Sequence, residues 1–301
     1  MVSGKNVTVV IPTAGNREKF LLRSILSATS QSVKVSKIIV VWDGEKDPFD
    51  FLYTFGSVIE VLVTPKPYSG VSTARQLGIE RASTELIGIL DDDDYWSQDK
   101  IFKQLDLIRQ HDNLENVFIF GRSVLEYEDG SVKAVVPIKR VGDQQSLADY
   151  FFSRIAIRNS TKTCSSSSYL FSRQLALDEP FKSNLVADED TDFILRISNR
   201  CKVFYCHEIL VNSTYRDTGG SGLSHSTRNI DEWFDWLRSL SGVVEKKFLS
   251  NIKVVYGVRH YLKKRKFSAA LKLWFATLFE GPDLISAVTG ASLFLRTFLS
   301  R

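Results

Sequence analysis

Four consecutive aspartates directly follow a short apolar run, and this pairing constrains the fold more than any other feature of the chain. Residues 86–90 read Leu-Ile-Gly-Ile-Leu, and residues 91–94 are all Asp. A short apolar run of this kind is typical of a buried strand, so we expect the carboxylates at its carboxyl end. Adjacent carboxylates repel one another, and a fold tolerates them best where a hard divalent cation such as Mg²⁺ or Mn²⁺ binds. The alternative is an exposed acidic turn before the next helix, with Asp99 as its cap.

The rest of the first half alternates strand-like runs with helical patterns. Strands are predicted over 7–11, 37–42, 58–63 and 85–90, and helices over 17–30, 71–82 and 99–110. This alternation predicts an α/β fold whose mostly parallel central sheet is flanked by helices. Ligands of such sheets bind beyond the carboxyl ends of the strands, where the chain places Pro12, Thr13, Asp43 and the aspartate run.

The second half has shorter predicted elements and then a helical tail. Strands are predicted over 117–120, 167–171, 203–205 and 210–215, and helices over 146–154 and 189–200. After a Gly- and Ser-rich stretch at 217–226, helices are predicted over 229–240, 247–264, 268–279 and 283–299. We therefore expect an α/β domain over residues 1–226 and a helical C-terminal extension over residues 227–301.

Cysteine usage and apolar runs indicate a cytoplasmic protein. Cys164, Cys201 and Cys206 are odd in number and lack CxxC spacing, which argues against a disulfide framework and a structural zinc site. The first residues lack a signal-peptide pattern. Since no apolar run reaches the length of about 18 residues that a bilayer requires, no transmembrane helix is predicted.

The charge is unevenly distributed along the chain. Residues 251–301 hold nine Lys or Arg against Glu280 and Asp283, although the net charge of the whole chain is only +4. A basic tail on a neutral-to-acidic body indicates an anionic partner for the tail. A solvated helical face is the alternative interpretation.

The order of the polar segments is more specific than any one of them. The series comprises, in chain order, Pro12-Thr13, Asn16-Arg17, Asp43-Gly44, the stretch 70–79, Leu90–Trp96, Glu189–Arg196 and Tyr215-Arg216. The chain resembles family 2 glycosyltransferases, which have the GT-A fold, of the bacterial surface-polysaccharide type. The resemblance is dense over residues 5–110 and patchier over 160–225.

The resemblance implies a role for each matching position. Thr13 and Asp43 match residues that hold the nucleobase, Asp93 matches the metal ligand, and Asp190 matches the catalytic base. Asp91 and Asp92 would lie along the ribose and pyrophosphate. The full set matching the nucleotide-sugar site is Pro12, Thr13, Arg17, Asp43, Arg75, Asp91, Asp92 and Arg216. Residues 1–115 would form the nucleotide-binding half and residues 116–226 the acceptor half of the catalytic domain.

These roles agree with the chemistry of sugar transfer from a nucleotide-sugar, with a UDP-sugar as the expected donor. A diphosphate leaving group gains negative charge that Mn²⁺ or Mg²⁺ neutralises. An acceptor hydroxyl needs a base to take its proton. A single displacement assisted by one base inverts the configuration at the anomeric carbon. Asp190 would lie in the first turn of a helix whose dipole favours the ionised form. Otherwise Glu189, Asp190 and Asp192 are ordinary acidic residues of a helix start.

Some positions depart from the family pattern. Trp42 stands where an acidic residue usually precedes the Asp-Gly pair, and Thr218 stands where many relatives carry a histidine. Two other classes of protein compete with the glycosyltransferase interpretation. A sugar-nucleotide nucleotidyltransferase would carry a Gly-rich loop after its first strand, but residues 12–17 contain one glycine. A non-catalytic scaffold protein would not need both the aspartate run and Asp190.

The acceptor side is less defined. The run Cys164–Ser168 either hydrogen-bonds a sugar or packs as part of a strand. The basic C-terminal helices also carry Trp and Phe, a pattern typical of peripheral contact with the cytoplasmic face of the membrane. The alternative is a helical hairpin in which Trp274 and Phe275 are core. The resemblance implies a glycan or lipid-linked oligosaccharide acceptor, and no nucleic-acid partner is expected.

Overall fold

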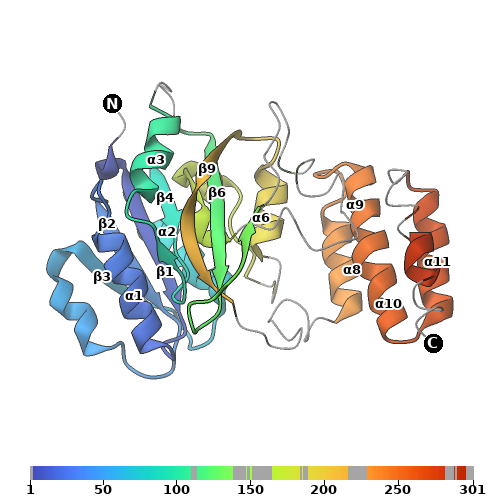
Figure 1. Ribbon diagram of the computed structural model, residues 1–301, viewed down its shortest axis with the longest axis horizontal. Coiled ribbons are helices and arrows are strands. Elements are labelled where there is room, and N and C mark those ends of the chain that lie inside the picture. Colours follow the sequence, from blue (N-terminus) through green and yellow to red (C-terminus); the bar gives the residue numbers. More distant parts are fainter. Residues whose placement is uncertain are drawn as a thin grey trace. The chain divides into compact units, whose positions relative to one another are not determined.

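The chain divides into two compact units, one built around a single sheet and one built of helices (Figure 1). The computed structural model describes residues 3–109, 114–137, 147, 150, 165–183, 185, 189–215, 229–281, 288 and 290–295. The first unit comprises Met1–Arg140, Cys164–Phe193 and Arg200–Ser226. The second comprises Val141–Thr163, Ile194–Asn199 and Thr227–Arg301.

The first unit begins with the predicted alternation of strands and helices. Its elements are β1 (Val7–Thr13), α1 (Glu18–Thr29), β2 (Lys37–Trp42), β3 (Ile59–Val63), α2 (Val71–Arg81), β4 (Leu86–Ile89) and α3 (Lys100–Leu107). β1 pairs in parallel with β2 and β4, and β2 pairs in parallel with β3. The carboxyl ends of these four strands therefore meet at one edge of the sheet.

The later strands make the sheet mixed. They are β5 (Tyr95–Trp96), β6 (Val117–Glu126), β7 (Val132–Val136), β8 (Leu170–Ser172) and β9 (Lys202–Thr214). β8 runs antiparallel to both β4 and β6, whereas β6 and β9 are parallel. Among the described residues the strand order is β3-β2-β1-β4-β8-β6-β9-β5, with β7 paired to β6. The parallel half matches the prediction, and the antiparallel β8 joins it to the second half.

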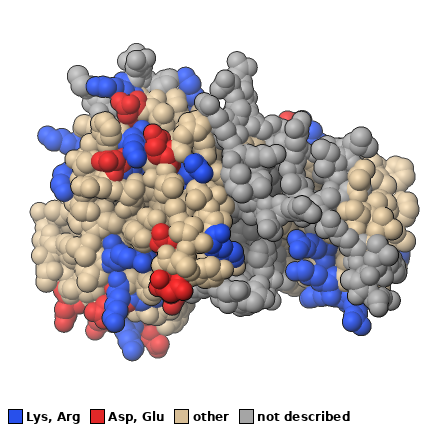
Figure 2. Space-filling view, in the orientation of Figure 1, with Lys and Arg blue, Asp and Glu red and all other residues tan. Residues whose placement is uncertain are grey.

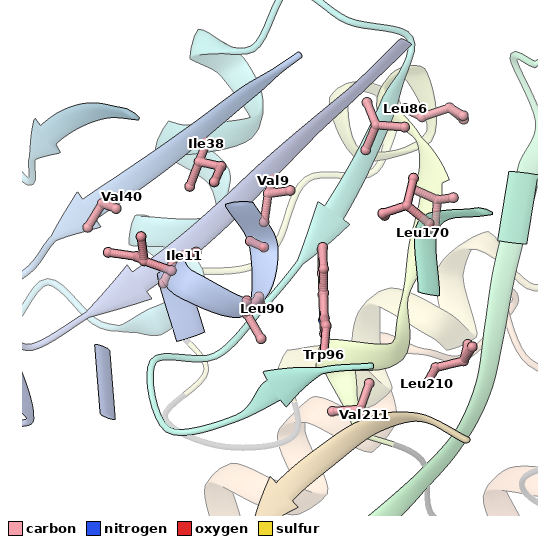
Figure 3. Packing of buried hydrophobic residues seen from close by; sticks show 14 of the residues in the cluster. Val9, Ile11, Ile38, Val40, Leu86, Leu90, Trp96, Leu170, Leu210 and Val211 are labelled. Atoms are coloured by element: carbon pink, nitrogen blue, oxygen red, sulfur yellow. The ribbon is translucent and has the colours of Figure 1, made fainter. Parts of the chain in front are cut away.

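Helices cover both faces of the parallel half. Val9 and Ile11 of β1 lie in a buried cluster (Figure 3). The same cluster contains Leu21 and Ile25 of α1. Side chains of a strand alternate between its two faces, and a Cβ at Gly78 of α2 would lie 2.5 Å from Val10 Cγ1. A glycine at this position therefore lets α2 approach the opposite face closely.

Two further helices belong to the second half of the chain. They are α5 (Arg173–Asp178) and α6 (Glu189–Ile197). The predicted helix 146–154 lies outside the described residues except for 147 and 150, and the Gly- and Ser-rich stretch 217–226 lies outside them entirely.

The second unit contains helices over three of the stretches predicted for the C-terminal extension, and the predicted helix 283–299 lies outside the described residues except for 288 and 290–295. The helices over these three stretches are α8 (Ile230–Ser239), α9 (Lys246–Ile252), α10 (Arg259–Lys263) and α11 (Phe267–Leu278), with a π-helical segment, Lys253–Val258, between α9 and α10. Val258, Leu262 and Ala270 form a buried cluster within this unit. Within the described ranges, no helix combines the length and apolar character needed to cross a bilayer.

Candidate active site

The aspartate run lies at the carboxyl end of β4, as the sequence predicts, and residues after β1 contact it. Thr13 Oγ1 donates to Asp92 Oδ2 at 2.7 Å. Arg17 Nη1 donates to Asp92 Oδ1 at 3.1 Å and to Asp93 Oδ2 at 2.6 Å. Pro12 lies beyond the last β1–β4 pair, Val10–Ile89, where a strand tolerates the missing N–H of proline. The loops after β1 and β4 thus form one charged cluster.

Arg75 connects the aspartate run to α6. Its Nη2 donates to Asp91 Oδ1 at 2.7 Å, and its Nη1 donates to Glu189 Oε1 at 2.8 Å. Ser166 Oγ donates to the other oxygen of Asp91 at 2.7 Å. The Arg75 side chain is only 4% exposed, so this charge is held inside the protein by the two carboxylates.

Asp94 is enclosed by hydroxyl groups. Its Oδ2 accepts hydrogen bonds from Ser165 at 3.0 Å, from Ser167 at 2.6 Å and from Ser213 at 3.0 Å. Its Oδ1 accepts one from the backbone N–H of Thr214 at 3.0 Å. Ser166–Ser168 form a short 3₁₀ turn before β8, in which Ser166 and Ser167 donate to the aspartate run and Ser168 Oγ donates to the carbonyl oxygen of Ser165. Ser166–Ser168 therefore do not pack as part of a strand, and in this structure Ser165 and Ser167 hydrogen-bond Asp94.

Arg23 and Ser24 of α1 hold the backbone of the aspartate run, and neither was predicted as a site residue. Arg23 Nη2 donates to the carbonyl oxygen of Asp93 at 2.6 Å and to Thr214 Oγ1 at 2.9 Å. Ser24 Oγ lies 3.1 Å from the carbonyl oxygen of Asp92. Only the tertiary structure shows that both residues reach a segment about 70 residues later.

Asp43 lies after β2, and its carboxylate organises the loop after β3. It accepts hydrogen bonds from Thr64 Oγ1 at 2.7 Å, from Ser69 N at 2.7 Å and from Gly70 N at 2.8 Å. Gly70 has a φ of +97° at the start of α2, a conformation that favours glycine. Trp42 is buried, and its Nε1 donates to the carbonyl oxygen of Lys46 at 2.7 Å. In place of an acidic residue, Trp42 thus packs against the loop after β2, where its ring also contacts that of Phe49.

The carboxylates of the cluster have shifted pKa values, because they are buried and lie close to one another and to Arg75. Burial alone would raise the pKa of Asp91, but the Arg75 guanidinium outweighs it and the pKa is lowered. Burial raises the pKa of Asp92 to about 6, with Asp93 and Asp91 adding to the rise and Thr13 and Arg17 opposing it. Burial, Asp91 and Asp93 raise the pKa of Asp94 to about 7. The run therefore favours the approach of a positive charge.

The candidate base lies in the first turn of α6. Asp190 Oδ1 accepts a hydrogen bond from the backbone N–H of Thr191 at 2.7 Å. The carboxylate also contributes, after Asp91 and Glu189, to a raised pKa of Arg75 against the effect of burial. Asp192 is fully buried and pairs with Lys182 at 3.2 Å, so it supports the helix. Arg216 lies outside the described residues.

The donor atoms of the cluster fit a hard divalent cation that a ligand helps to bind. Among the residues that the structure describes, no group of three or more His, Cys, Asp or Glu side chains is placed to hold a metal ion. Mg²⁺, however, is commonly bound through one or two carboxylates plus substrate phosphates. Asp91 and Asp93 are suited to this role, because their side chains are 28% and 19% exposed, whereas Asp92 is 10% exposed.

The mixed sheet and the acidic cluster at the ends of its strands are those expected of a transferase with the GT-A fold. The sequence profile described as glycosyl transferase family 2 matches residues 8–177. Because this match spans more than half of the chain, the protein belongs to glycosyl transferase family 2, and it is a glycosyltransferase.

Relatives and solved structures agree with this assignment. An uncharacterized glycosyltransferase of Rickettsia typhi is 26% identical over 88% of this chain and 84% of its own length. The amylovoran biosynthesis glycosyltransferase AmsB of Erwinia amylovora is 27% identical over 63% of this chain and 62% of its own length. The crystal structure of S. aureus TarS 1–349 in complex with UDP-GlcNAc matches 98% of this chain and 91% of its own, with a TM-score of 0.65 and 15% identity. The GT-A fold expected from the sequence is thereby confirmed.

Proposed function

We propose that the protein transfers a sugar from a nucleotide-sugar to a hydroxyl group of a glycan or lipid-linked oligosaccharide. The first candidate donor is a UDP-sugar, and the transfer inverts the configuration at the anomeric carbon. One observation carries the proposal: Arg75 joins Asp91, in the aspartate run, to Glu189, beside the candidate base Asp190. TarS, whose fold this chain shares, is described in complexes with UDP and with UDP-GlcNAc, which supports this class of donor.

The residues of the chain divide into a donor side and an acceptor side. Asp43 and Thr13 are the proposed contacts of the nucleobase, and Arg17 is placed to offer its charge to the diphosphate, since its side chain is 34% exposed. Asp91 and Asp93 would hold Mn²⁺ or Mg²⁺, which neutralises charge on the leaving diphosphate when bound. Asp190 takes the proton of the acceptor hydroxyl as that oxygen bonds to the anomeric carbon. The nucleoside diphosphate leaves with the electrons of the broken glycosidic bond.

The proposed acceptor is presented at the cytoplasmic face of a membrane. Leu271, Phe275 and Phe279, which follow one another at four-residue intervals on and just after α11, are 43%, 49% and 90% exposed. Residues four apart lie on the same side of a helix, so these form one apolar stripe. The exposed basic residues 263–266 directly precede α11. Such a combination suits a helix in the headgroup region of an anionic membrane.

Thermal unfolding of the purified protein with single nucleotides tests the donor. UDP, GDP, CMP, dTDP and their sugars are compared with and without Mn²⁺. We expect stabilisation by UDP-sugars when Mn²⁺ is present, because a ligand that binds the folded state raises the unfolding midpoint. Asp93→Ala should lose the metal-dependent part of the shift while its own unfolding stays cooperative. No shift with any nucleotide would contradict the proposed donor class, and an unchanged metal effect in Asp93→Ala would contradict the ligand assignment.

A further inference from the structure

Arg75 joins two parts of the site that lie far apart in the sequence. One arm of its guanidinium reaches Asp91 at 2.7 Å, and the other reaches Glu189 at 2.8 Å, 114 residues further along the chain. Its Nη2 also lies 3.1 Å from Ser166 Oγ. The side chain is 4% exposed, so almost none of its surface faces solvent. A planar guanidinium suits this bridge, because its donors point in fixed directions toward two acceptors.

The bridge acts on the turn of α6 that carries Asp190. Glu189 precedes Asp190 directly, so a displacement of Glu189 moves the candidate base. The same turn has further supports: Lys182 pairs with Asp192 at 3.2 Å, and the rings of Phe181 and Phe193 stack with centroids 4.4 Å apart. These two supports attach the turn to the segment just before α6, whereas Arg75 attaches it to the aspartate run.

We infer that Arg75 is a positioning residue that sets the place of Asp190 relative to the aspartate run, and not a ligand of the nucleotide as the family resemblance implies. The inference rests on the proposed function, since Asp190 matters only if it is the base. Both Nη groups are engaged by carboxylates inside the protein, and Nε, which has no hydrogen-bond partner among the described residues, is buried. With 4% of its surface exposed, the side chain offers little to a nucleotide-sugar. Lysine at this position would offer one compact charge that cannot bridge both carboxylates.

Steady-state kinetics of Arg75→Lys separates positioning from nucleotide binding. We expect kcat to fall by about 100-fold, because a base displaced by about 1 Å costs this much. The KM for the nucleotide-sugar and the Kd for UDP should stay within about twofold of the wild-type values, since the contacts that bind the nucleotide before the reaction are unaffected. Arg81→Lys is the matched control, because Arg81 lies on the same helix, is 60% exposed and pairs with Glu60. A weakened Kd for UDP with unchanged kcat would show that Arg75 binds the nucleotide and would overturn the inference.

Glu189 provides the partner test. Glu189→Gln keeps the length and an acceptor oxygen, so it should retain more turnover than Glu189→Ala. Arg75→Lys combined with Glu189→Ala should be little worse than either single change, because both remove the same contact. Additive losses would contradict the bridge. The Glu189 pair also keeps the inference testable if Arg75→Lys fails to fold.

A readout that needs no turnover separates this inference from the proposed function. Amide hydrogen exchange in α6 should be faster in Glu189→Ala than in Glu189→Gln, because Gln keeps an acceptor for the hydrogen bond from Arg75 and Ala removes the bridge. Equal exchange would overturn the inference. If the wild-type protein transfers no sugar from any nucleotide-sugar, the proposed function fails, while hydrogen exchange still decides whether the bridge holds α6.

Discussion

Asp43 accepts three hydrogen bonds from its own surroundings, and this limits what it offers to a ligand. A carboxylate has about four acceptor sites. Thr64, Ser69 and Gly70 occupy three of them in the described structure. The side chain can therefore receive about one further N–H, as from a nucleobase, while it keeps the loop after β3 in shape. A local sequence pattern predicted a polar residue at this strand end, but it did not reveal the partners that orient it.

Asp190→Asn tests the base at the residue scale. We expect nucleotide affinity to be kept and turnover to fall by about 10²–10⁴-fold, since the amide cannot accept the proton of the acceptor hydroxyl. Turnover and UDP binding are measured on the same preparation. Asp192→Asn serves as the contrast: Asp192 is fully buried beside Lys182, so we expect a lower unfolding temperature as its main effect. Near-normal transfer by Asp190→Asn would exclude Asp190 as the base.

At the scale of elements, the serine turn shows where sequence prediction stopped. The stretch 167–171 was predicted as a strand, but Ser166–Ser168 form a 3₁₀ turn and β8 begins at Leu170. Serine side chains bond readily to nearby backbone, which favours turns. Ser165 Oγ accepts from the backbone N–H of Ser167 at 3.2 Å in this way. The turn places three hydroxyls against the aspartate run from a segment about 70 residues away.

The enclosed Asp94 gives a pH prediction for this turn. Its pKa is raised from an ordinary value of 3.8 to about 7 in the fold, mainly by burial. The folded state therefore binds the proton of Asp94 more tightly than the unfolded chain does. As the pH rises from about 4 to about 7, this contribution to the free energy of unfolding is lost. Relative to wild type, the free energy of unfolding of Asp94→Asn should rise over this range by at most roughly 4 kcal/mol, since each pKa unit between the two states corresponds to about 1.4 kcal/mol.

Denaturant unfolding at several pH values in EDTA measures this effect without bound metal. Asp47→Asn is the control, because that carboxylate is exposed and its replacement should leave the pH dependence unchanged. A constant difference between Asp94→Asn and wild type at every pH would exclude a raised pKa for Asp94.

Across the whole molecule, strands and helices with a regular apolar pattern could be predicted from the sequence. Strands without such a pattern, and site residues held by contacts distant in the sequence, could not. Apolar runs and helical spacing predicted β2 and α2 almost to the residue. β9 was predicted as two pieces because His207 and Glu208 interrupt its apolar pattern, although its pairing with β6 continues past register shifts. β7 lies at an edge with exposed residues and was not predicted. The expectation that ligands bind beyond the carboxyl ends of parallel strands located the aspartates. Arg23, Ser166 and Glu189, however, reach the site only through long-range contacts.

The division of charge between the two units supports a membrane partner for the helical one. Figure 2 shows Lys and Arg gathered on the helical unit, whereas both signs of charge are interspersed on the sheet unit. Trp274 packs within the helical unit, with its ring 5.7 Å from that of Phe294, so the core alternative holds for this residue. Phe275 and Phe279 are exposed, at 49% and 90%, and are the proposed apolar contacts.

Sedimentation with lipid vesicles tests this surface on the full chain. The wild type should bind vesicles containing phosphatidylglycerol more than pure phosphatidylcholine, and added salt should weaken binding because it screens the basic residues. Phe275→Ser with Phe279→Ser should lower the partition coefficient by about tenfold or more, since burying one Phe contributes roughly 1.5–3 kcal/mol. Phe102→Ser is the matched control, because Phe102 is 52% exposed on α3 of the sheet unit.

Replacing Lys263, Lys264, Arg265 and Lys266 by Ala should remove the preference for phosphatidylglycerol. Equal binding of the double Phe variant and wild type would exclude this stripe as the membrane contact, and loss of helical circular dichroism would assign both Phe residues to the core.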